Sequence, residues 1–332
     1  MIFPRIYIPL FLLLAASRAC AADLPGIPEF IDAMVAKHQF QRSELVNAFQ
    51  RAERRQAIID AINLPATAKP WVDYRASFVN DLSIRDGIAF WEKHAPTLLR
   101  AESDYGVPQS IIVAIIGVET RYGQRTGNFR TLDALTTLAF DYPRRADFFR
   151  SELENYLLLS RDQDLDLMQV RGSYAGALGI PQFMPSSYRN YAVDFNHDGK
   201  LDLLNDPQDA IGSVANYFSQ FGWKRGRPVT AQATVSQEIC PGSLLGSRLM
   251  QDWADAGVKP AGDFAKNDSA RLLVFTVNDD REFWLAYPNF DVITRYNNSD
   301  YYAMSVYQLS EALREARGKL SVELSPAVAP PQ

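Results

Sequence analysis

The sequence predicts a mainly α-helical protein of the α+β class, with one small strand-containing insertion. Two observations support this prediction. From residue 28 to about residue 225, apolar positions recur at helical spacing between short breakers. After Gly226 the composition changes to short runs rich in Val, Thr and Phe, which are typical of strands. We therefore expect a helical body and a small strand-containing part at about residues 227–290.

The helices of the body have recognisable starts. These starts are Ser43, Ser83 with Asp86 as a capping box, Pro108 ahead of Gln109–Glu119, Thr131, a segment near 144–160, and Asp206-Pro207. Pro96 falls inside the second pattern and should kink or restart that helix. Gly222 is expected to end the last of them.

The strand-containing part and the end of the chain follow. Val229–Val235 is rich in Thr, Val and Ala, and two further runs, Leu272–Val277 and Phe283–Tyr287, flank a polar turn. A last helix is predicted to begin at a Ser299 cap. Residues 317–332 are expected to form a disordered tail that becomes Pro-rich at its end.

Size and charge limit the classes of function. The chain has 332 residues and a formal net charge of -5, so nothing favours nucleic acid as a ligand. With only 3 histidines and no cluster of them, a zinc site is not expected. The 47% hydrophobic content is enough for a large core.

The first residues are typical of an export signal, predicted to span residues 1–22. Arg5 precedes the apolar run Ile6–Ala16, and small residues follow where a signal peptidase would cut. The expected location is the periplasm. An outer-membrane lipoprotein through Cys20 is the alternative, although Ser17-Arg18 before this cysteine departs from the usual lipid-attachment pattern. Cys240 is interpreted as a lone thiol.

Glu119 is the strongest candidate for catalysis. Residues 111–118 carry no charge, so the helix they form should be buried nearly all round. A carboxyl group at its C-terminal end meets apolar surroundings and the negative end of the helix dipole. Both effects favour the protonated form, which a general acid needs. The simpler alternative is an ion pair with Arg121 or Arg125.

A second candidate is the Gly/Pro-rich segment Gly172–Tyr188. Its glycines permit a ligand to approach the backbone closely, and Ser173, Gln182 and Ser187 offer hydrogen bonds suited to a sugar. An ordinary irregular loop is the alternative, but the run Gly176-Ala177-Leu178-Gly179 is apolar for a solvated linker.

Together these runs resemble the lytic murein transglycosylase B family of lysozyme-like peptidoglycan-cleaving enzymes. The resemblance covers roughly residues 28–316. It rests on Gly117–Gly123, Tyr142–Ala146, Gly172–Tyr188, Ala192–Phe195, Asp209–Phe218 and Arg295–Asn297. It implies a lysozyme-like helical catalytic core with a helical domain, together forming one region over residues 23–316.

The resemblance also implies a site. Glu119 would be the single catalytic acid and base. The glycan cleft would be lined by Tyr74, Arg144, Arg145, Ser173, Gln182, Phe183, Tyr217, Tyr296, Asn297 and Tyr302. A role in the core explains the aromatic members of this set equally well.

The implied reaction is non-hydrolytic cleavage of the β-1,4 bond between MurNAc and GlcNAc, which leaves 1,6-anhydro-MurNAc ends. Ordinary glycosidases use two carboxylates, and Asp141 and Asp162 lie outside the motifs of the resemblance. A hydrolytic muramidase on the same scaffold and an inactive glycan-binding scaffold are the alternatives. The expected partners are peptidoglycan glycan strands, with other cell-wall enzymes as further candidates, and the protein is expected to be a monomer.

An EF-hand-like loop is predicted at residues 194–209. Asp194, Asn196, Asp198 and Asp202 occupy loop positions 1, 3, 5 and 9, and Gly199 occupies position 6. Lys200 would contribute its carbonyl group. Asn205 replaces the usual Glu at position 12, and the resemblance implies that Asp209 closes the site instead. We expect a structural Ca²⁺ held by Asp194, Asn196, Asp198, Lys200 and Asp209.

Overall fold

The computed structural model describes residues 24–64, 69–236, 246–262 and 264–323. The predicted signal peptide, Cys20, Cys240 and the last nine residues lie outside this part of the chain.

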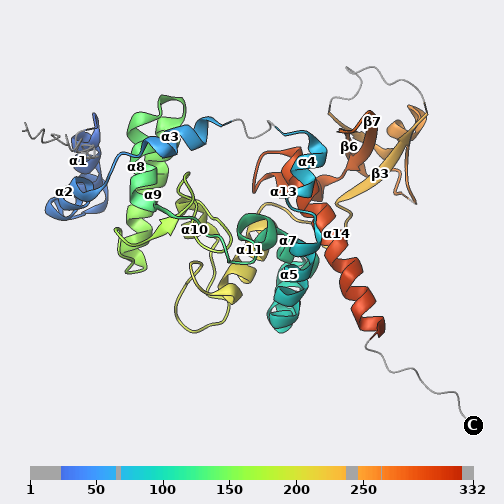
Figure 1. The fold of residues 1–332 in the computed structure, drawn as a ribbon, viewed down its shortest axis with the longest axis horizontal. Coiled ribbons are helices and arrows are strands. Elements are labelled where there is room, and N and C mark those ends of the chain that lie inside the picture. The colour runs from blue at the N-terminus through green and yellow to red at the C-terminus, as the bar shows by residue number, and fades with distance from the viewer. Residues whose placement is uncertain (1–23, 65–68, 237–245, 263, 324–332) are drawn as a thin grey trace, which may run out of the picture.

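The architecture confirms a mainly helical protein with a small sheet (Figure 1). The helices before the sheet are α1 (Ile27–His38), α2 (Arg42–Arg51), α3 (Gln56–Asn63), α4 (Trp71–Ala76), α5 (Asp81–Lys93), α6 (Ala95–Tyr105), α7 (Gln109–Thr120), α8 (Thr131–Asp141), the 3-10 turn η2 (Pro143–Arg145), α9 (Ala146–Asp162), α10 (Pro185–Tyr191) and α11 (Pro207–Gln220).

Most helix starts agree with the sequence, and two caps differ. Ser43 lies inside α2, whose N-cap is Gln41. Pro96 does separate two helices, because α5 ends at Lys93 and α6 begins at Ala95. Asp206 caps α11 by accepting a hydrogen bond from the amide of Gln208 at 2.7 Å. The start of α5 lies earlier than predicted. Its cap is Asn80, whose side chain accepts from the amide of Ser83 at 3.0 Å.

The sheet lies inside the region expected to contain strands. It consists of β3 (Thr230–Val235), β4 (Ser247–Leu249), β5 (Val258–Pro260), β6 (Ser269–Val277) and β7 (Asp280–Ala286) in the order β4-β6-β7-β3-β5. The pairs are antiparallel, and β6 and β7 form a hairpin in which Val277 faces Asp280. The short α12 (Met250–Asp255) closes a separate small core through Trp253.

Two helices complete the chain and correct one boundary. They are α13 (Pro288–Thr294) and α14 (Asp300–Glu323), and the Ser299 hydroxyl accepts from the amide of Tyr302 at 3.3 Å, as a cap should. The helix α14 continues to Glu323, so residues 317–323 are helical and the predicted start of the disordered tail at residue 317 is wrong.

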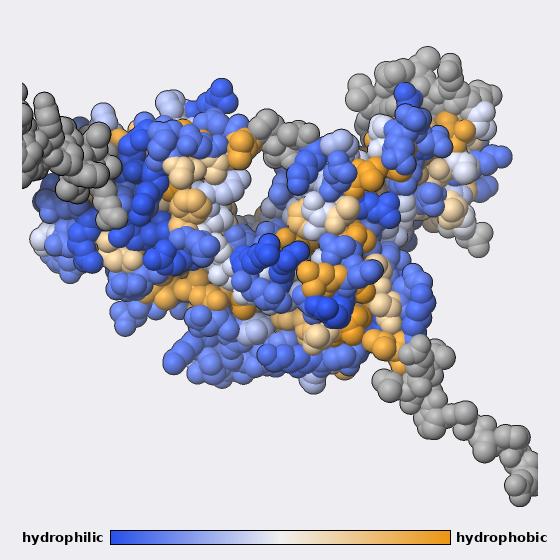
Figure 2. Space-filling model, in the orientation of Figure 1, coloured by the Kyte–Doolittle hydropathy of each residue, from blue (hydrophilic) through white to orange (hydrophobic). Residues whose placement is uncertain are grey.

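The elements are arranged along the long axis of the molecule. Helices α1–α3 with α8 and α9 lie at one end, the sheet lies at the other, and α7 and α11 lie between them (Figure 1). The molecule is hollowed between the two ends (Figure 2). A second, two-stranded pairing joins β1 (Phe129–Arg130) to β2 (Arg171–Gly172).

Candidate active site

The site is built on α7, a helix buried over most of its length. Each residue from Ile111 to Ile116 is at most 3% exposed, as expected for an apolar helix packed on all sides. The helix contacts α5, α6, α11 and α14. Glu119 lies in its last turn, half-buried, just before Arg121 takes a left-handed conformation that ends the helix.

Tyr302 on α14 is a direct polar partner of the Glu119 carboxyl group. The Tyr302 hydroxyl donates to Oε1 at 2.5 Å. Burial raises the pKa of Glu119 to about 7, and the hydrogen bond from Tyr302 opposes this rise. About half of the molecules would therefore carry a protonated Glu119 near neutral pH. This is the protonation state that a general acid requires at the start of a reaction.

Two further tyrosines lie close to Glu119. Burial raises the pKa of Tyr74 and of Tyr296, and the negative charge of Glu119 adds to both shifts. The hydroxyl of Tyr296 is not available to the carboxyl group, because it donates to the carbonyl oxygen of Pro181 at 2.5 Å. These aromatic rings exclude water from the carboxyl group, which is the physical cause of its raised pKa.

The Gly/Pro-rich segment is fixed to the end of α7. The buried Thr120 hydroxyl donates to the carbonyl of Ile180 at 2.8 Å and accepts from the amide of Gly123 at 2.9 Å. Gly179, with φ +70°, allows close packing, because a Cβ there would meet the carbonyl oxygen of Leu203 at 2.1 Å. The structure thus places this segment beside the catalytic candidate.

The polar residues predicted in this segment make local hydrogen bonds. Ser173 accepts from the amide of Ala177 at 3.0 Å. The Gln182 side chain donates to the carbonyls of Thr126 at 3.0 Å and Gly179 at 2.8 Å. Both side chains are partly exposed, so the Ser173 hydroxyl can still donate to a ligand and the Gln182 side-chain oxygen can still accept from one.

Two predicted cleft residues form the aromatic layer behind the site. Phe183 is 2% exposed and Tyr217 is 7% exposed, and their ring centroids lie 5.5 Å apart. Both rings pack on Tyr296, and the Tyr217 hydroxyl donates to the carbonyl of Arg295 at 2.8 Å. Their burial favours the core role that the sequence left open.

Three predicted residues are exposed and lie outside this inner group. Arg144 and Arg145 belong to η2, and the guanidinium of Arg145 lies 4.2 Å from the ring centre of Phe148. Asn297 is exposed directly after Tyr296. The hydrogen bonds, ion pairs and ring contacts that the structure describes join none of the three to Glu119.

The aspartates considered as second catalytic carboxylates are engaged elsewhere. Asp141 pairs with Arg54 at 2.6 Å, and Asp162 lies 3.6 Å from both Arg161 and Arg189. Within the described ranges, the pKa of Glu119 is shifted by burial and Tyr302, not by a neighbouring carboxylate. The site therefore presents one acid/base group.

The EF-hand-like loop has part of the expected geometry. Gly199 adopts φ +85° at the sharp turn of position 6. The Asp194 carboxylate accepts from the amide of Gly199 at 2.9 Å, and Asp198 accepts from that of Lys200 at 2.9 Å. Oxygen donors of this type suit a hard cation such as Ca²⁺.

The predicted ligands make hydrogen bonds within the loop and to neighbouring residues. Among the described residues, no group of three or more His, Cys, Asp or Glu side chains is placed to hold a metal ion. Asp209 is buried, and its two oxygens accept from the amides of Phe195 at 2.8 Å and Asp202 at 2.9 Å. Asn196 donates to Asp206 at 2.7 Å. These side chains close the loop upon itself.

Sequence reasoning missed two functional contacts. The direct bond of Tyr302 to Glu119 joins residues 183 positions apart, and no local pattern reveals it. Thr120 lies in the Gly117–Gly123 motif but was not singled out. Its polar side chain after a charge-free helix was the available signal, because a buried hydroxyl needs partners.

A desolvated carboxyl group, bonded to a tyrosine at the end of a buried helix, indicates the class: an acid/base enzyme on a mainly helical fold. The particular family follows from comparison with known proteins. The family model described as "Transglycosylase SLT domain" matches residues 24–311. The chain belongs to this family.

Relatives agree in sequence and structure. The membrane-bound lytic murein transglycosylase B of Escherichia coli is 43% identical, over 89% of this chain and 84% of the relative. The soluble lytic transglycosylase SltB1 of Pseudomonas aeruginosa is 46% identical with a TM-score of 0.84, over 89% of this chain and 100% of that chain. Escherichia coli Slt35, solved in complex with calcium, is 42% identical with a TM-score of 0.85, over 91% and 96%.

A more distant structure was solved with a peptidoglycan fragment. Pseudomonas aeruginosa SltB3, in complex with NAG-anhNAM-pentapeptide, is 29% identical with a TM-score of 0.79, over 87% of this chain and 78% of that chain. Together the findings identify a lytic transglycosylase, an enzyme that cleaves the glycan strands of peptidoglycan. The alternatives of a hydrolytic muramidase and of an inactive scaffold are not favoured.

Proposed function

We propose that Glu119 acts alone as the acid and then the base in this cleavage. Its pKa of about 7 supports the proposal most strongly, because one group can then give and take a proton near neutral pH. Glu119 first donates its proton to the glycosidic oxygen that leaves. It then accepts the proton of the 6-hydroxyl of MurNAc, which closes on the anomeric carbon.

A second carboxylate is not needed in this scheme. The 2-acetamido oxygen of MurNAc attacks its own anomeric carbon and holds the positive charge that a partner carboxylate would otherwise balance. The 6-hydroxyl displaces this oxygen and yields a 1,6-anhydro end without consuming water. Tyr302 holds Oε1 of Glu119 in place during both proton transfers.

Products formed in H₂¹⁸O test this mechanism. We expect the wild-type protein to release from purified glycan strands anhydro products, one water lighter than hydrolytic products and free of ¹⁸O. A substantial share of products with ¹⁸O at the reducing end would show that water attacks. In that case the attack of the 6-hydroxyl would be wrong, while the role of Glu119 as acid and base could stand.

The glycan is proposed to lie over the tyrosines and the Gly/Pro-rich segment. Tyr74 and Tyr296 supply partly exposed rings for sugar faces, and Ser173, Gln182 and Asn297 supply hydrogen bonds. Arg144 and Arg145 would contact the strand farther from Glu119. Phe183, Tyr217 and Tyr302 support these residues from behind.

A structural Ca²⁺ is proposed for the loop 194–209. The donor types, the turn at Gly199 and the calcium complex of Slt35 support it. Asp194, Asn196, Asp198 and the carbonyl of Lys200 would hold the ion, and Asp209, whose oxygens also accept from backbone amides, would join them. The loop reaches the active site, because the carbonyl of Leu203 accepts from the amide of Ile180 at 2.8 Å.

The proposed location is the periplasm, where the substrate lies. None of the helices in the described ranges is long and apolar enough to cross a membrane. The E. coli relative is named membrane-bound, so the processing of Cys20 decides between a released and a lipid-attached protein. A monomeric state and contacts with other cell-wall enzymes also belong to this proposal.

A further inference from the structure

The backbone directly after Glu119 follows an unusual course. Arg121 has φ +49°, Tyr122 has φ +59° and Gly123 has φ +85°, so three consecutive residues are left-handed. Residues other than glycine rarely adopt this conformation, because the Cβ lies too close to the following carbonyl oxygen. Strain of this kind persists only where the surrounding structure holds it, and it is concentrated at functional sites. The contacts of Tyr122 explain how this turn is held.

The side chain of Tyr122 fills a slot between α5 and α7. A Cβ added at Gly117 of α7 would lie 2.6 Å from the Tyr122 hydroxyl. A Cβ added at Gly87 of α5 would collide with the same hydroxyl and would lie 2.6 Å from the side chain of Leu313 on α14. Both glycines are buried inside helices, where glycine is otherwise unfavourable. The tyrosine gives both of them a packing reason, because it occupies the space that the two missing side chains leave.

The hydroxyl of Tyr122 also has a fixed hydrogen-bond partner. It donates to the carbonyl of Ser83, in the first turn of α5, at 2.7 Å. Burial raises the pKa of Tyr122, so the hydroxyl stays protonated and remains a donor. The Tyr122 ring centre lies 5.6 Å from that of Phe90, also on α5. The turn after α7 is thereby attached to α5, in addition to its attachment to the Gly/Pro-rich segment through Thr120.

Glu119 lies in the short stretch of chain between Gly117 and Tyr122, the two residues that this contact joins. The amide of Tyr122 also donates to the carbonyl of Ile116 at 3.2 Å, which closes the last turn of α7. The direction in which the Glu119 side chain leaves the helix therefore depends on where the Tyr122 ring is seated. Proton transfer is sensitive to this direction, because a displacement of about 1 Å can lower a rate by roughly 10²-fold.

We propose that Tyr122 is a positioning residue for the catalytic acid: its ring, seated between Gly87 and Gly117, holds the end of α7 so that Glu119 meets the glycosidic oxygen. This inference rests on the proposed role of Glu119. Tyr122 exchanges no proton with the substrate, because its hydroxyl is bonded to Ser83. Its contribution is made only when the proton is transferred, so its loss lowers kcat and leaves KM nearly unchanged.

Turnover of purified glycan strands by two variants separates this role from general support of the fold. Tyr122→Phe keeps the ring and loses the bond to Ser83, whereas Gly87→Ala introduces a Cβ into the slot. Both are assayed well below their Tm, so that the folded fraction does not limit the rate. We expect kcat to fall by roughly tenfold in Tyr122→Phe and by roughly 10²-fold in Gly87→Ala, with KM within about twofold of the wild-type value.

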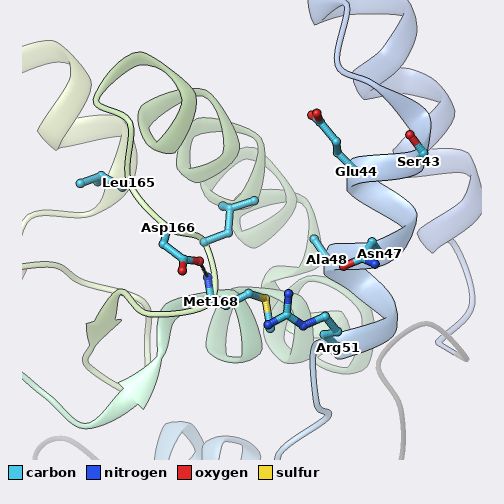
Figure 3. A pocket seen from close by; sticks show the side chains of 9 residues that line it. Ser43, Glu44, Asn47, Ala48, Arg51, Leu165, Asp166 and Met168 are labelled. Carbon is cyan, nitrogen blue, oxygen red and sulfur yellow. Dashed lines mark hydrogen bonds between the residues drawn. The ribbon is translucent and has the colours of Figure 1, made fainter.

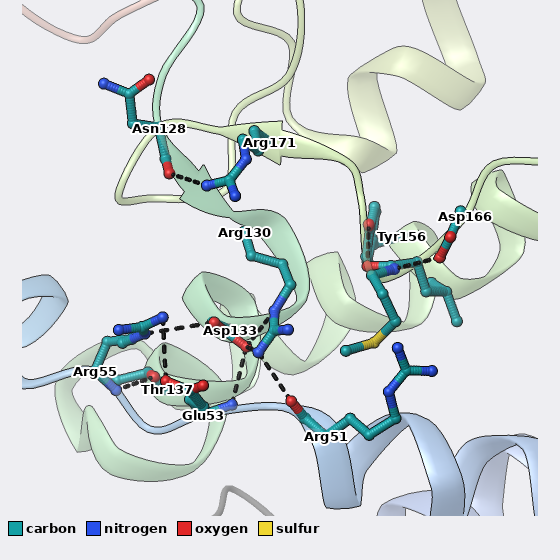
Figure 4. Close-up of polar contacts among 12 residues, drawn as sticks. Arg51, Glu53, Arg55, Asn128, Arg130, Asp133, Thr137, Tyr156, Asp166 and Arg171 are labelled. Atoms are coloured by element: carbon teal, nitrogen blue, oxygen red, sulfur yellow. Dashed lines mark hydrogen bonds and ion pairs between the residues drawn. The ribbon is translucent and has the colours of Figure 1, made fainter. Parts of the chain in front are cut away.

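Tyr156 on α9 provides the matched control for the tyrosine. It supports the loop after α9, which lines a cavity beside α2 (Figure 3). Its hydroxyl donates to the carbonyl of Leu167 in this loop at 3.1 Å (Figure 4). Tyr156 is fully buried, so Tyr156→Phe should lower the Tm at least as much as Tyr122→Phe does, yet leave kcat at the wild-type value. Gly318→Ala on α14 is the control for the glycine, because a Cβ there would meet nothing within 4 Å.

Three results would overturn the positioning role. The first is a wild-type kcat in folded Tyr122→Phe and Gly87→Ala, and the second is an equal fall of kcat in Tyr156→Phe. The third is a higher KM with unchanged kcat, which would place Tyr122 in glycan binding instead. Glu119→Gln in the same assay keeps the two claims apart. If it is inactive while Tyr122→Phe turns over as the wild type does, only the positioning role is wrong; if it is active, the acid lies elsewhere and the proposed function fails.

Discussion

At the scale of single residues, Glu119 combines two opposing influences. Its pKa rises because apolar side chains and aromatic rings replace water, and the 2.5 Å bond from Tyr302 limits that rise by stabilising the charged form. The protonated group serves as the acid and the ionised group serves as the base. With a pKa near 7, both the protonated and the ionised form of Glu119 are populated near neutral pH.

Removing the Tyr302 hydroxyl should change the pH dependence of the reaction. In Tyr302→Phe the charged form of Glu119 loses its hydrogen bond, so the pKa of Glu119 rises further. For kcat/KM, which needs the protonated acid, we expect the alkaline limb near pH 7 in the wild type and at higher pH in the variant. We expect kcat at low pH to fall by roughly tenfold, because the carboxyl group is less well positioned.

The matched control is Tyr296→Phe, which removes a buried hydroxyl that bonds to Pro181 and not to Glu119. Its alkaline limb should stay where the wild-type limb lies. An unmoved limb in Tyr302→Phe, or equal shifts in both variants, would contradict a specific effect of Tyr302 on the acid.

At the scale of elements, the site depends on how α7 and the Gly/Pro-rich segment are joined. Thr120 connects them. Its side chain is 1% exposed, and its hydroxyl forms hydrogen bonds with both the segment and the turn after the helix. Tyr302 approaches from the start of α14, which packs along α7. The catalytic geometry therefore results from three elements that meet at the C-terminal end of one buried helix.

Thr120→Val should show how much the two hydrogen bonds of the Thr120 hydroxyl contribute to stability and activity. Valine has nearly the same shape, but it leaves the carbonyl of Ile180 and the amide of Gly123 without their partner. We expect a loss of about 1–3 kcal/mol in the free energy of unfolding, measured by urea denaturation, and a lower kcat. Thr120→Ser keeps the hydroxyl and should retain more of both quantities. If the valine and serine variants behave alike, the Thr120 hydrogen bonds do not connect the segment to α7 in the way described.

At the scale of the whole molecule, the fold was largely predictable and parts of the site were not. The charge-free helix before Glu119, the Pro96 break and the strand-rich region are local patterns, and the structure confirms them. Tyr302 reaches Glu119 from 183 residues away, so only tertiary packing reveals it. Phe183 and Tyr217 could face either a sugar or the core, since aromatic side chains suit both. The sequence of the loop at 194–209 predicts a calcium motif. It does not predict that Asp209 accepts hydrogen bonds from backbone amides.

Calcium should stabilise the folded protein if the loop binds it. We expect added Ca²⁺ to raise the Tm of the wild-type protein and a chelator to lower it, because the ion binds the folded state. Asp194→Ala should remove this dependence, whereas Asp279→Ala, a change in the β6–β7 turn, should leave it intact. A wild-type melting curve that is the same with calcium and with chelator would contradict the proposed site.

The measurement that tests the central claim most directly is turnover of purified peptidoglycan by Glu119→Gln. The amide cannot donate an acidic proton, so we predict that kcat falls by roughly 10²- to 10⁴-fold while the protein folds normally. Folding is checked by its melting curve. Since the folded-state pKa of about 7 exceeds the unfolded value near 4.5, wild-type stability falls as the pH rises through that window. The variant should therefore melt higher than the wild type at pH 8. A folded Glu119→Gln protein that still cleaves peptidoglycan at a substantial fraction of the wild-type rate would contradict the account and place the acid elsewhere.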